Sequence, residues 1–191
     1  MRHAQKIAAG FACTALVALL AACGASSDSN TNANSAANSA TNAAVPRSAD
    51  AAASSALTQQ SVTQINAIRA SVRNCGGISF AVAAAVAGSA KLEAAALQQA
   101  QYMKSTDTLT HIGGANSSIG DRVSSAGYTW SAVGENITSG YETLAEVLQG
   151  WVESPGHCAN LMNPNFSDVG IAQSAGGVDS YWALTLAKPG N

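Results

Sequence analysis

Hydrophobic residues recur at helical spacing in three long stretches of the chain. The pattern predicts a first helix that begins at Leu57 and ends near Asn74-Cys75-Gly76-Gly77, a second over residues 91–104 and a third over residues 143–153. The positions expected to face the core are, in order, Leu57, Ser61, Ile65, Ile68 and Val72; then Leu92, Ala95, Ala96, Gln99 and Met103; then Leu144, Val147, Leu148 and Trp151.

Capping residues mark the ends of two helices. Thr143 followed by Glu146 is a capping-box pattern, in which two otherwise unpaired amide donors gain partners. A shorter helix is expected over residues 117–127, begun by a serine and ended by a glycine. The run Ser154-Pro155-Gly156 is expected to stop the third long helix.

The pattern changes to a period of two near the C-terminal end. In residues 181–186, Trp, Leu and Leu alternate with Tyr, Ala and Thr, which predicts a strand. Residues 168–174 are expected to form a second strand, joined to the first through residues 175–179. The apolar, Ala-rich segment 78–88 has no clear assignment. A sheet with helices on both faces is the simplest architecture for these elements.

The N-terminal 22 residues have the pattern of an export signal. Arg2 and Lys6 precede an uncharged run of about 16 residues, shorter than the roughly 20 of a membrane span. The run ends in Leu20-Ala21-Ala22-Cys23, which resembles the lipobox of bacterial lipoproteins, with Cys23 as the lipidation site. The alternative is an ordinary signal peptide that leaves a free Cys23. Gly24, in place of Asp, resembles the pattern sorted to the outer membrane.

Composition divides the exported part into a tether and one domain. Residues 23–56 comprise the lipidated cysteine and a segment of mostly Ala, Ser, Asn and Thr, which offers too little apolar surface to fold and is expected to be disordered. Residues 57–191 have the length of a single domain, expected to be a monomer.

Charge excludes one class of partner. Without residues 1–22 the chain has seven Lys and Arg against eleven Asp and Glu, and no basic cluster follows the signal. Nucleic acid is therefore not expected as a partner, because binding its backbone needs clustered cations. The membrane is expected to be contacted through the lipid anchor alone.

Two of the four cysteines belong to the export signal and its cleavage site. Cys75 and Cys158 remain as a pair in an oxidising compartment, and we expect them to form one disulfide. The alternative is two buried thiols.

Three motif groups carry a resemblance to a protein family. The first is His111-Ile112-Gly113-Gly114 with Gly120-Asp121-Arg122 and Ala126-Gly127-Tyr128; the second is Gly134-Glu135-Asn136-Ile137 with Gly140-Tyr141; the third is residues 151–157, WVESPGH, followed by NLMNP at 160–164. In this order they resemble a bacterial CAP domain (cysteine-rich secretory protein, antigen 5, pathogenesis-related). The resemblance implies an α+β fold, a three-layer α-β-α sandwich with a small, mostly antiparallel sheet.

The resemblance also implies a site. His111, Glu135 and His157 are expected to line a shared cavity, with Glu135 placed in a turn. Imidazoles can bind Zn²⁺ or another divalent cation, and a carboxylate can orient an imidazole, so His111 and His157 are candidate metal ligands.

A fourth acidic residue of such a site would lie three residues after Trp151, where this chain has Ser154. Glu153 is the nearest carboxylate and is retained as a candidate cleft residue. At 100° per residue, however, Glu153 lines up with Glu146 on what looks like a solvated stripe. A three-residue site with Ser154 nearby is an equal expectation.

Two functions follow from these residues. The first is a non-enzymatic binding module at the cell envelope, with a small apolar or metal-linked ligand such as a lipid or sterol, or a glycan or protein partner. The second is a metal-assisted hydrolase or peptidase with His111 and His157 as ligands and Glu135 as base; Ser154 is a weaker candidate nucleophile. A structural envelope protein with a vestigial cavity is a third reading.

Overall fold

The computed structural model describes residues 49–174 and 176–191, with side chains from residue 56 onward. Signal peptide, Cys23 and most of the tether lie outside these residues. The elements are α1 (Ala49–Arg69), β1 (Arg73–Cys75), β2 (Ile78–Phe80), β3 (Ala87–Gly88), α2 (Ala90–Thr106), η1 (Gly114–Asn116), α3 (Ile119–Ser125), β4 (Trp130–Ser139), α4 (Leu144–Glu153), α5 (Pro155–Met162), β5 (Asp168–Gln173) and β6 (Tyr181–Pro189).

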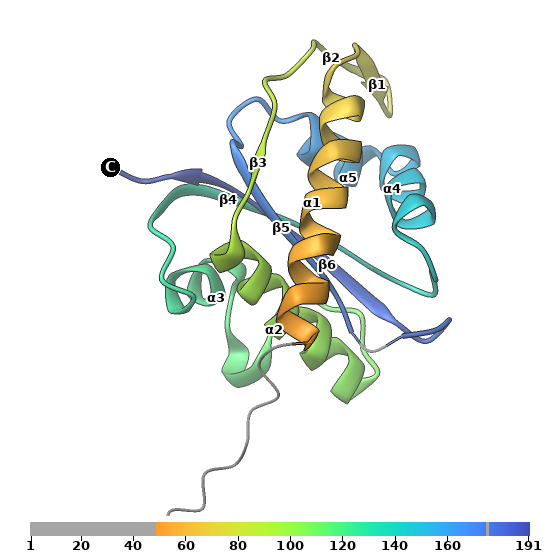
Figure 1. Cartoon of the computed structure of the whole chain (residues 1–191). Helices are drawn as coiled ribbons and strands as arrows, with labels where there is room; N and C mark the ends of the chain where they lie inside the picture. The colour runs from red at the N-terminus through yellow and green to blue at the C-terminus, as the bar shows by residue number, and fades with distance from the viewer. Residues whose placement is uncertain (1–48, 175) are drawn as a thin grey trace, which may run out of the picture. The chain divides into compact units, whose positions relative to one another are not determined.

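Four strands form the main sheet in the order β3-β5-β6-β4 (Figure 1). The central strand β6 pairs antiparallel with β5 and β4, and β3 adds a short parallel pair at the edge of β5. β1 and β2 form a separate antiparallel pair. The expected small, mostly antiparallel sheet is confirmed.

Helices cover both faces of this sheet, which gives the expected α-β-α layers. On one face, α1, α4 and α5 pack against the large side chains of Trp182, Leu184 and Leu186 from β6. On the other, α2 and α3 pack against small ones, including Ala183 and Ala187 of the same strand. The alternation along β6 therefore serves two cores, and β6 is buried on both sides until Ala187.

The small residues let α2 lie very close to the sheet. A Cβ at Gly170 of β5 would overlap the backbone of α2 at Leu92 and Glu93. The inward face of α2 is itself rich in alanine, with Ala96 and Ala100 fully buried. This layer is held by close backbone approach, whereas the opposite layer is filled by large side chains.

The predicted helices are confirmed, with one difference at each end of the first. α1 begins at Ala49, inside the segment assigned to the tether, and ends at Arg69. Val72, expected on its buried face, lies beyond the helix and is 67% exposed. No helix in the described ranges combines the length and apolarity that crossing a bilayer needs.

The expected caps are present. Ser118 and Asp121 form a capping box on α3, and Thr143 and Glu146 form one on α4. Ser154 ends α4 as expected, with an extended backbone (φ −90°, ψ 120°), and a new helix, α5, begins directly after it at Pro155. A proline is compatible with a first helical turn, where its missing N–H would have no partner.

Two segments differ from their sequence assignments. The placement of Glu135 in a turn was wrong, because residues 130–139 form β4, the longest strand of the sheet. The motif residues Gly134 and Asn136 weaken the strand pattern, which is why it was missed. The unassigned segment 78–88 contributes the short strands β2 and β3.

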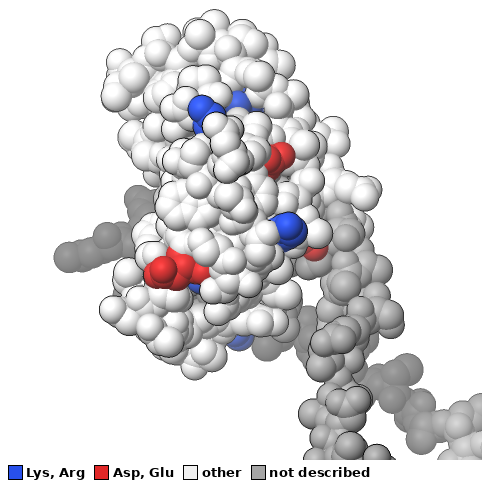
Figure 2. Space-filling model, turned by 90° about the vertical axis from the view of Figure 1, so that its left-hand side faces the viewer, with Lys and Arg blue, Asp and Glu red and all other residues white. Residues whose placement is uncertain are grey.

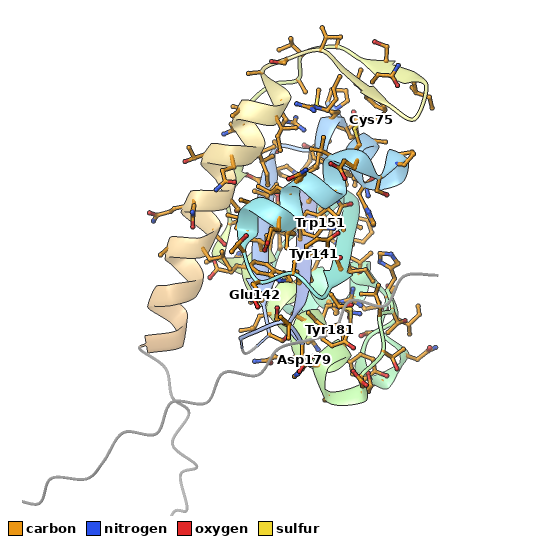
Figure 3. All side chains as sticks on the ribbon, turned by 90° about the vertical axis from the view of Figure 1, so that its right-hand side faces the viewer. Cys75, Tyr141, Glu142, Trp151, Asp179 and Tyr181 are labelled. Atoms are coloured by element: carbon orange, nitrogen blue, oxygen red, sulfur yellow. A yellow bond between two sulfur atoms is a disulfide. The ribbon has the colours of Figure 1, made fainter. Side chains whose placement is uncertain are left out.

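The expected disulfide joins Cys75 of β1 to Cys158 of α5, with Cα atoms 5.5 Å apart. Both cysteines are buried. Figure 3 shows Cys75 at the end of the molecule that carries α5. Beside it, a Cβ at Gly76 would lie 2.6 Å from Pro155, so the start of α5 packs tightly on the β1–β2 turn.

Candidate functional site

The site is built around the carboxylate of Glu135, in the middle of β4. Its side chain points to the α2–α3 side of the sheet and is buried, and its Oε1 lies 2.8 Å from Nδ1 of His111. His111 belongs to the loop between α2 and η1, and its side chain is 58% exposed. Because the carboxylate engages Nδ1, the imidazole is oriented with Nε2 available to a partner.

The second oxygen of Glu135 is occupied as well. Arg122 of α3, which is 1% exposed, donates from Nη2 to Oε2 at 2.6 Å. Its Nη1 donates to the backbone oxygens of His111 and Ser117. One guanidinium thus neutralises the carboxylate and holds the loop that carries His111.

His157 lies on α5 and is positioned through its backbone. Asn136, the residue after Glu135, is fully buried and donates from Nδ2 to the carbonyl oxygen of His157 at 3.1 Å. Asn160 donates to Asn136 Oδ1 at 2.9 Å and to the carbonyl oxygen of Glu135 at 3.3 Å. These bonds fasten α5 to the strand that carries the carboxylate.

Glu135 and Asn136, which are consecutive residues of β4, therefore hydrogen-bond to His111 and His157 respectively. Side chains alternate across a strand, so Glu135 reaches His111 on one face and Asn136 reaches α5 on the other. β4 is an edge strand of the sheet, so the His111 loop from one helical layer and α5 from the other can both approach it.

The two imidazoles are close enough to interact electrostatically. Burial lowers the pKa of His157, and the positive charge that His111 can carry lowers it further. The His157 ring also lies 6.4 Å from the ring of Trp151, centroid to centroid, at a tilt of 53°. Trp151 points from α4 toward the sheet in Figure 3.

Glu153 and Ser154 lie apart from this group. Glu153 is exposed and accepts a hydrogen bond from Gln149 at 3.0 Å, on the same outer side of α4 that the helical-wheel argument indicates. Ser154 occupies the junction of α4 and α5, and its hydroxyl makes no capping bond there. Within the described part of the chain, no hydrogen bond joins Ser154 to His157.

The residues present fit only a partial cation site. Zn²⁺ in proteins takes four ligands, or three with an open position. Across residues 49–174 and 176–191, no cluster of three or more His, Cys, Asp or Glu side chains has a geometry able to hold a metal ion. Glu135 uses both oxygens internally, so a cation here would have His111 and His157 as its protein ligands, completed by water or a bound partner.

Polar atoms without protein partners gather beneath the His111 loop. Of the five such buried atoms among the described side chains, four belong to Gln99, Ser117, Arg122 and Thr185. A Cβ at Gly113 would lie 2.6 Å from Ser117 Oγ and 2.9 Å from Gln99 Oε1. Gln99 also donates to the carbonyl oxygen of Thr110. Buried atoms of this kind are usually bridged by ordered water.

Sequence reasoning did not assign roles to Arg122, Asn136, Asn160 and Gln99. Arg122 and Asn136 do lie inside the motifs that carry the family resemblance. A signal was therefore present: each of these two polar side chains lies two residues after a glycine, in a chain with few charges. Nothing in the helical pattern separates Gln99 from the apolar residues of its stripe.

Together, an α-β-α sandwich and two histidines near a strand carboxylate define a class of α+β domain. Residues 62–186 match the CAP, or cysteine-rich secretory protein, family, and the chain belongs to this family.

One curated relative matches in sequence. A 91-residue stretch is 34% identical to the Bacillus subtilis protein YkwD, which is itself uncharacterised; the stretch covers 48% of this chain and 35% of YkwD. The chain thus spans about a third of that relative.

Two solved structures share the fold. An extracellular SCP-domain protein of Bacillus anthracis matches with a TM-score of 0.58 at 23% identity, over 71% of this chain and 41% of that one. An outer surface protein of Borrelia burgdorferi matches with a TM-score of 0.54 at 18% identity, over 70% and 96%.

Proposed function

We propose that this chain is a non-enzymatic binding domain displayed at the cell envelope. Its ligand site is the surface formed by His111 and His157, which takes a small apolar or metal-linked ligand or part of an extracellular partner. Glu135 orients His111 and does not itself contact the ligand.

One observation carries the proposal: both oxygens of Glu135 are engaged, by His111 and by Arg122. A general base must be within reach of the proton that it removes, and the side chain of Glu135 is only 3% exposed. Glu135 is instead enclosed by His111 and Arg122, which leaves it badly placed to contact a substrate or to serve as a third metal ligand. The hydrolase reading therefore lacks its base.

The environment of His157 supports binding rather than acid–base chemistry. Its lowered pKa keeps the imidazole neutral near pH 7, which is the form that binds a cation or packs against an apolar group. Trp151, which is itself buried, lies beside this imidazole and adds to its apolar surroundings.

Export and anchoring belong to the same proposal. The basic start, the uncharged run and the cysteine at position 23 support lipid attachment, and Gly24 supports the outer membrane as destination. The two structural relatives are described as an extracellular and an outer surface protein, which agrees with display outside the cytoplasm.

Calorimetry with the purified mature chain tests the proposal. Zn²⁺ and vesicles that contain sterol or fatty acid are titrated separately into the wild type, His111→Ala, His157→Ala and Glu153→Gln. We expect saturable binding of at least one probe, weakened in both histidine variants. Glu153→Gln is the matched control, because Glu153 is exposed and bonded only to Gln149, and it should bind like the wild type.

Turnover of peptide and ester substrates, measured with and without Zn²⁺, distinguishes a hydrolase from a binding domain. Turnover that disappears in His157→Ala and persists in Ser154→Ala would replace the binding module with a metal-assisted hydrolase. Absence of both turnover and binding would leave the structural reading.

A further inference from the structure

Trp130 differs from the other two tryptophans of the chain in its exposure. Trp151 and Trp182 are 1% and 2% exposed, whereas Trp130, the first residue of β4, is 37% exposed. Its contacts are with Gly120 and Ser124 of α3, and none of the hydrogen bonds of the His111 and His157 site involves it. An exposed tryptophan forgoes the stabilisation that burial of its ring would give, so its surroundings can indicate a binding site.

The indole of Trp130 is held in place by α3. Its Nε1 donates to Ser124 Oγ at 3.0 Å. The ring lies against Gly120, one turn earlier in α3, where a Cβ would be only 2.8 Å from ring atom Cζ2. Because the ring is fixed before a ligand arrives, little side-chain entropy is lost on binding.

The fixed indole forms one wall of a hollow of about 430 Å³. The other lining residues are Ser124, Gly127, Tyr128 and Thr129, none of which is charged. A Cβ at Gly127 would meet nothing within 4 Å, so the hollow is open on that side. Figure 2 faces the side of the molecule where α3 lies, and charged side chains are sparse on it.

The polar groups around the hollow are mainly hydroxyls. Thr129 is exposed, and Ser124 can accept a bond from Trp130 while its own proton remains to be donated. Tyr128 is already committed, because its hydroxyl donates to Asp168 at 2.5 Å. Burial and this bond raise the pKa of Tyr128, so it remains a neutral donor.

We propose that this hollow is a carbohydrate subsite, in which a neutral sugar ring stacks on Trp130 and its hydroxyls bond to Ser124, Thr129 and nearby backbone groups. A gluco-configured pyranose has a flat face of C–H groups that suits an aromatic ring, and hydroxyls around its edge. An uncharged lining favours a neutral sugar. An acyl chain would leave the hydroxyls at the rim without partners.

The inference is independent of the histidine site and can be tested separately. Cellotriose and chitotriose, two neutral β-linked probes, are titrated into the mature chain while the three indole N–H signals are followed by ¹H–¹⁵N NMR. We expect a saturable shift of the Trp130 signal and unchanged signals from Trp151 and Trp182. Trp130→Leu should weaken binding by about tenfold or more, and Trp130→Phe by less, because it keeps an aromatic face.

Two further variants keep the test decisive. Ser124→Ala keeps the indole but removes its hydrogen bond to Ser124, and should weaken sugar binding severalfold. This variant replaces Trp130→Leu in the test if Trp130→Leu does not fold. Val178→Ala changes another exposed apolar residue and should have no effect. The proposal would be overturned if neither sugar bound saturably, or if binding survived in Trp130→Leu. It would also be overturned if 1-dodecanol, an acyl-chain probe, shifted the Trp130 signal and the sugars did not.

Discussion

At the scale of single residues, the molecule places a buried carboxylate between an arginine and a histidine. Glu135 and Arg122 have side chains only 3% and 1% exposed, whereas His111 is largely exposed. Both charges of the inner pair are removed from water, so each depends on the other for compensation. The exposed imidazole of His111 is oriented by its hydrogen bond to Glu135, which Arg122 holds in place.

Arg122→Met should destabilise the protein strongly. It leaves the Glu135 carboxylate buried without its cation, and the expected loss in unfolding free energy is about 3–5 kcal/mol. Urea denaturation measures it, with Lys91→Met on the exposed surface of α2 as a control that changes stability by less than about 0.5 kcal/mol.

The double variant Arg122→Met, Glu135→Leu identifies the cause. If the penalty comes from the uncompensated carboxylate, removing that carboxylate should restore part of the lost stability. Equal stability of the single and double variants would contradict this explanation.

Stability should depend on pH through His157. Its pKa is lower in the folded protein than in the unfolded chain, so the unfolded chain takes up the proton first as the pH falls. The unfolding free energy should therefore decrease from about pH 7 downward, through the ordinary histidine pKa near 6.5, until His157 is protonated in the folded state as well. Denaturation at several pH values measures this decrease, which should be smaller in His157→Gln.

At the scale of elements, the two faces of the sheet are packed by different means. Trp151 and Trp182 fill the layer under α4, whereas α2 approaches β5 so closely that Gly170 has no room for a side chain. Large side chains can adjust to a changed neighbour through their rotamers. Backbone in direct contact cannot.

Gly170→Ala should therefore be far more harmful than Gly156→Ala. The added methyl group at Gly170 meets the backbone of α2 and should cost about 1–3 kcal/mol or more. At Gly156, inside α5, it meets nothing within 4 Å and should stabilise by about 0.4–1 kcal/mol. Thermal unfolding of both variants checks the contrast; similar melting temperatures would show that α2 can move away from β5.

The disulfide ties β1 to α5 across a separation of 83 residues. Replacing Cys75 and Cys158 by serine together should lower the unfolding free energy by about 4 kcal/mol, because the unfolded chain gains the freedom of a long loop. Urea denaturation of the double variant is compared with that of the oxidised wild type. A loss below 1 kcal/mol would mean that the α5 contacts do not depend on the cross-link.

At the scale of the whole molecule, the chain joins a low-charge domain to an N-terminal segment with the sequence pattern of an export signal. Its seven cations beyond the signal include Arg69 and Arg122, which are both buried. Few cations are left to attract an anionic surface, so electrostatic attraction to a membrane is weak. The proposed membrane attachment therefore rests on lipidation of Cys23.

Cys23→Ser should release the protein from membranes. Without a thiol at that position no diacylglycerol can be attached, and the domain has too little positive charge to stay bound. Fractionation of expressing cells, with palmitate labelling, measures the change. Wild type and variant in the same fraction would contradict lipid anchoring.

Much of the fold could be predicted from local patterns. The stripe Leu144, Val147, Leu148 and Trp151 is buried throughout, and the caps at Thr143 and Ser118 are present, because helical period and capping depend only on residues within one or two turns. The strand at residues 181–186 follows from its alternation for the same reason. The cysteine pair was predictable because only two cysteines remained.

The hydrogen-bond partners of the site residues, which decide its chemistry, could not be predicted without the tertiary structure. The sequence by itself determined which side chains are available, among them His111, His157 and Glu135. Only the folded chain decided that Arg122 bonds to the second oxygen of Glu135 and that Asn136 fastens α5 to β4. The physical reason is that helix period and capping are properties of neighbours along the chain. Compensation of a buried charge depends instead on which groups from distant segments arrive beside it when the layers pack.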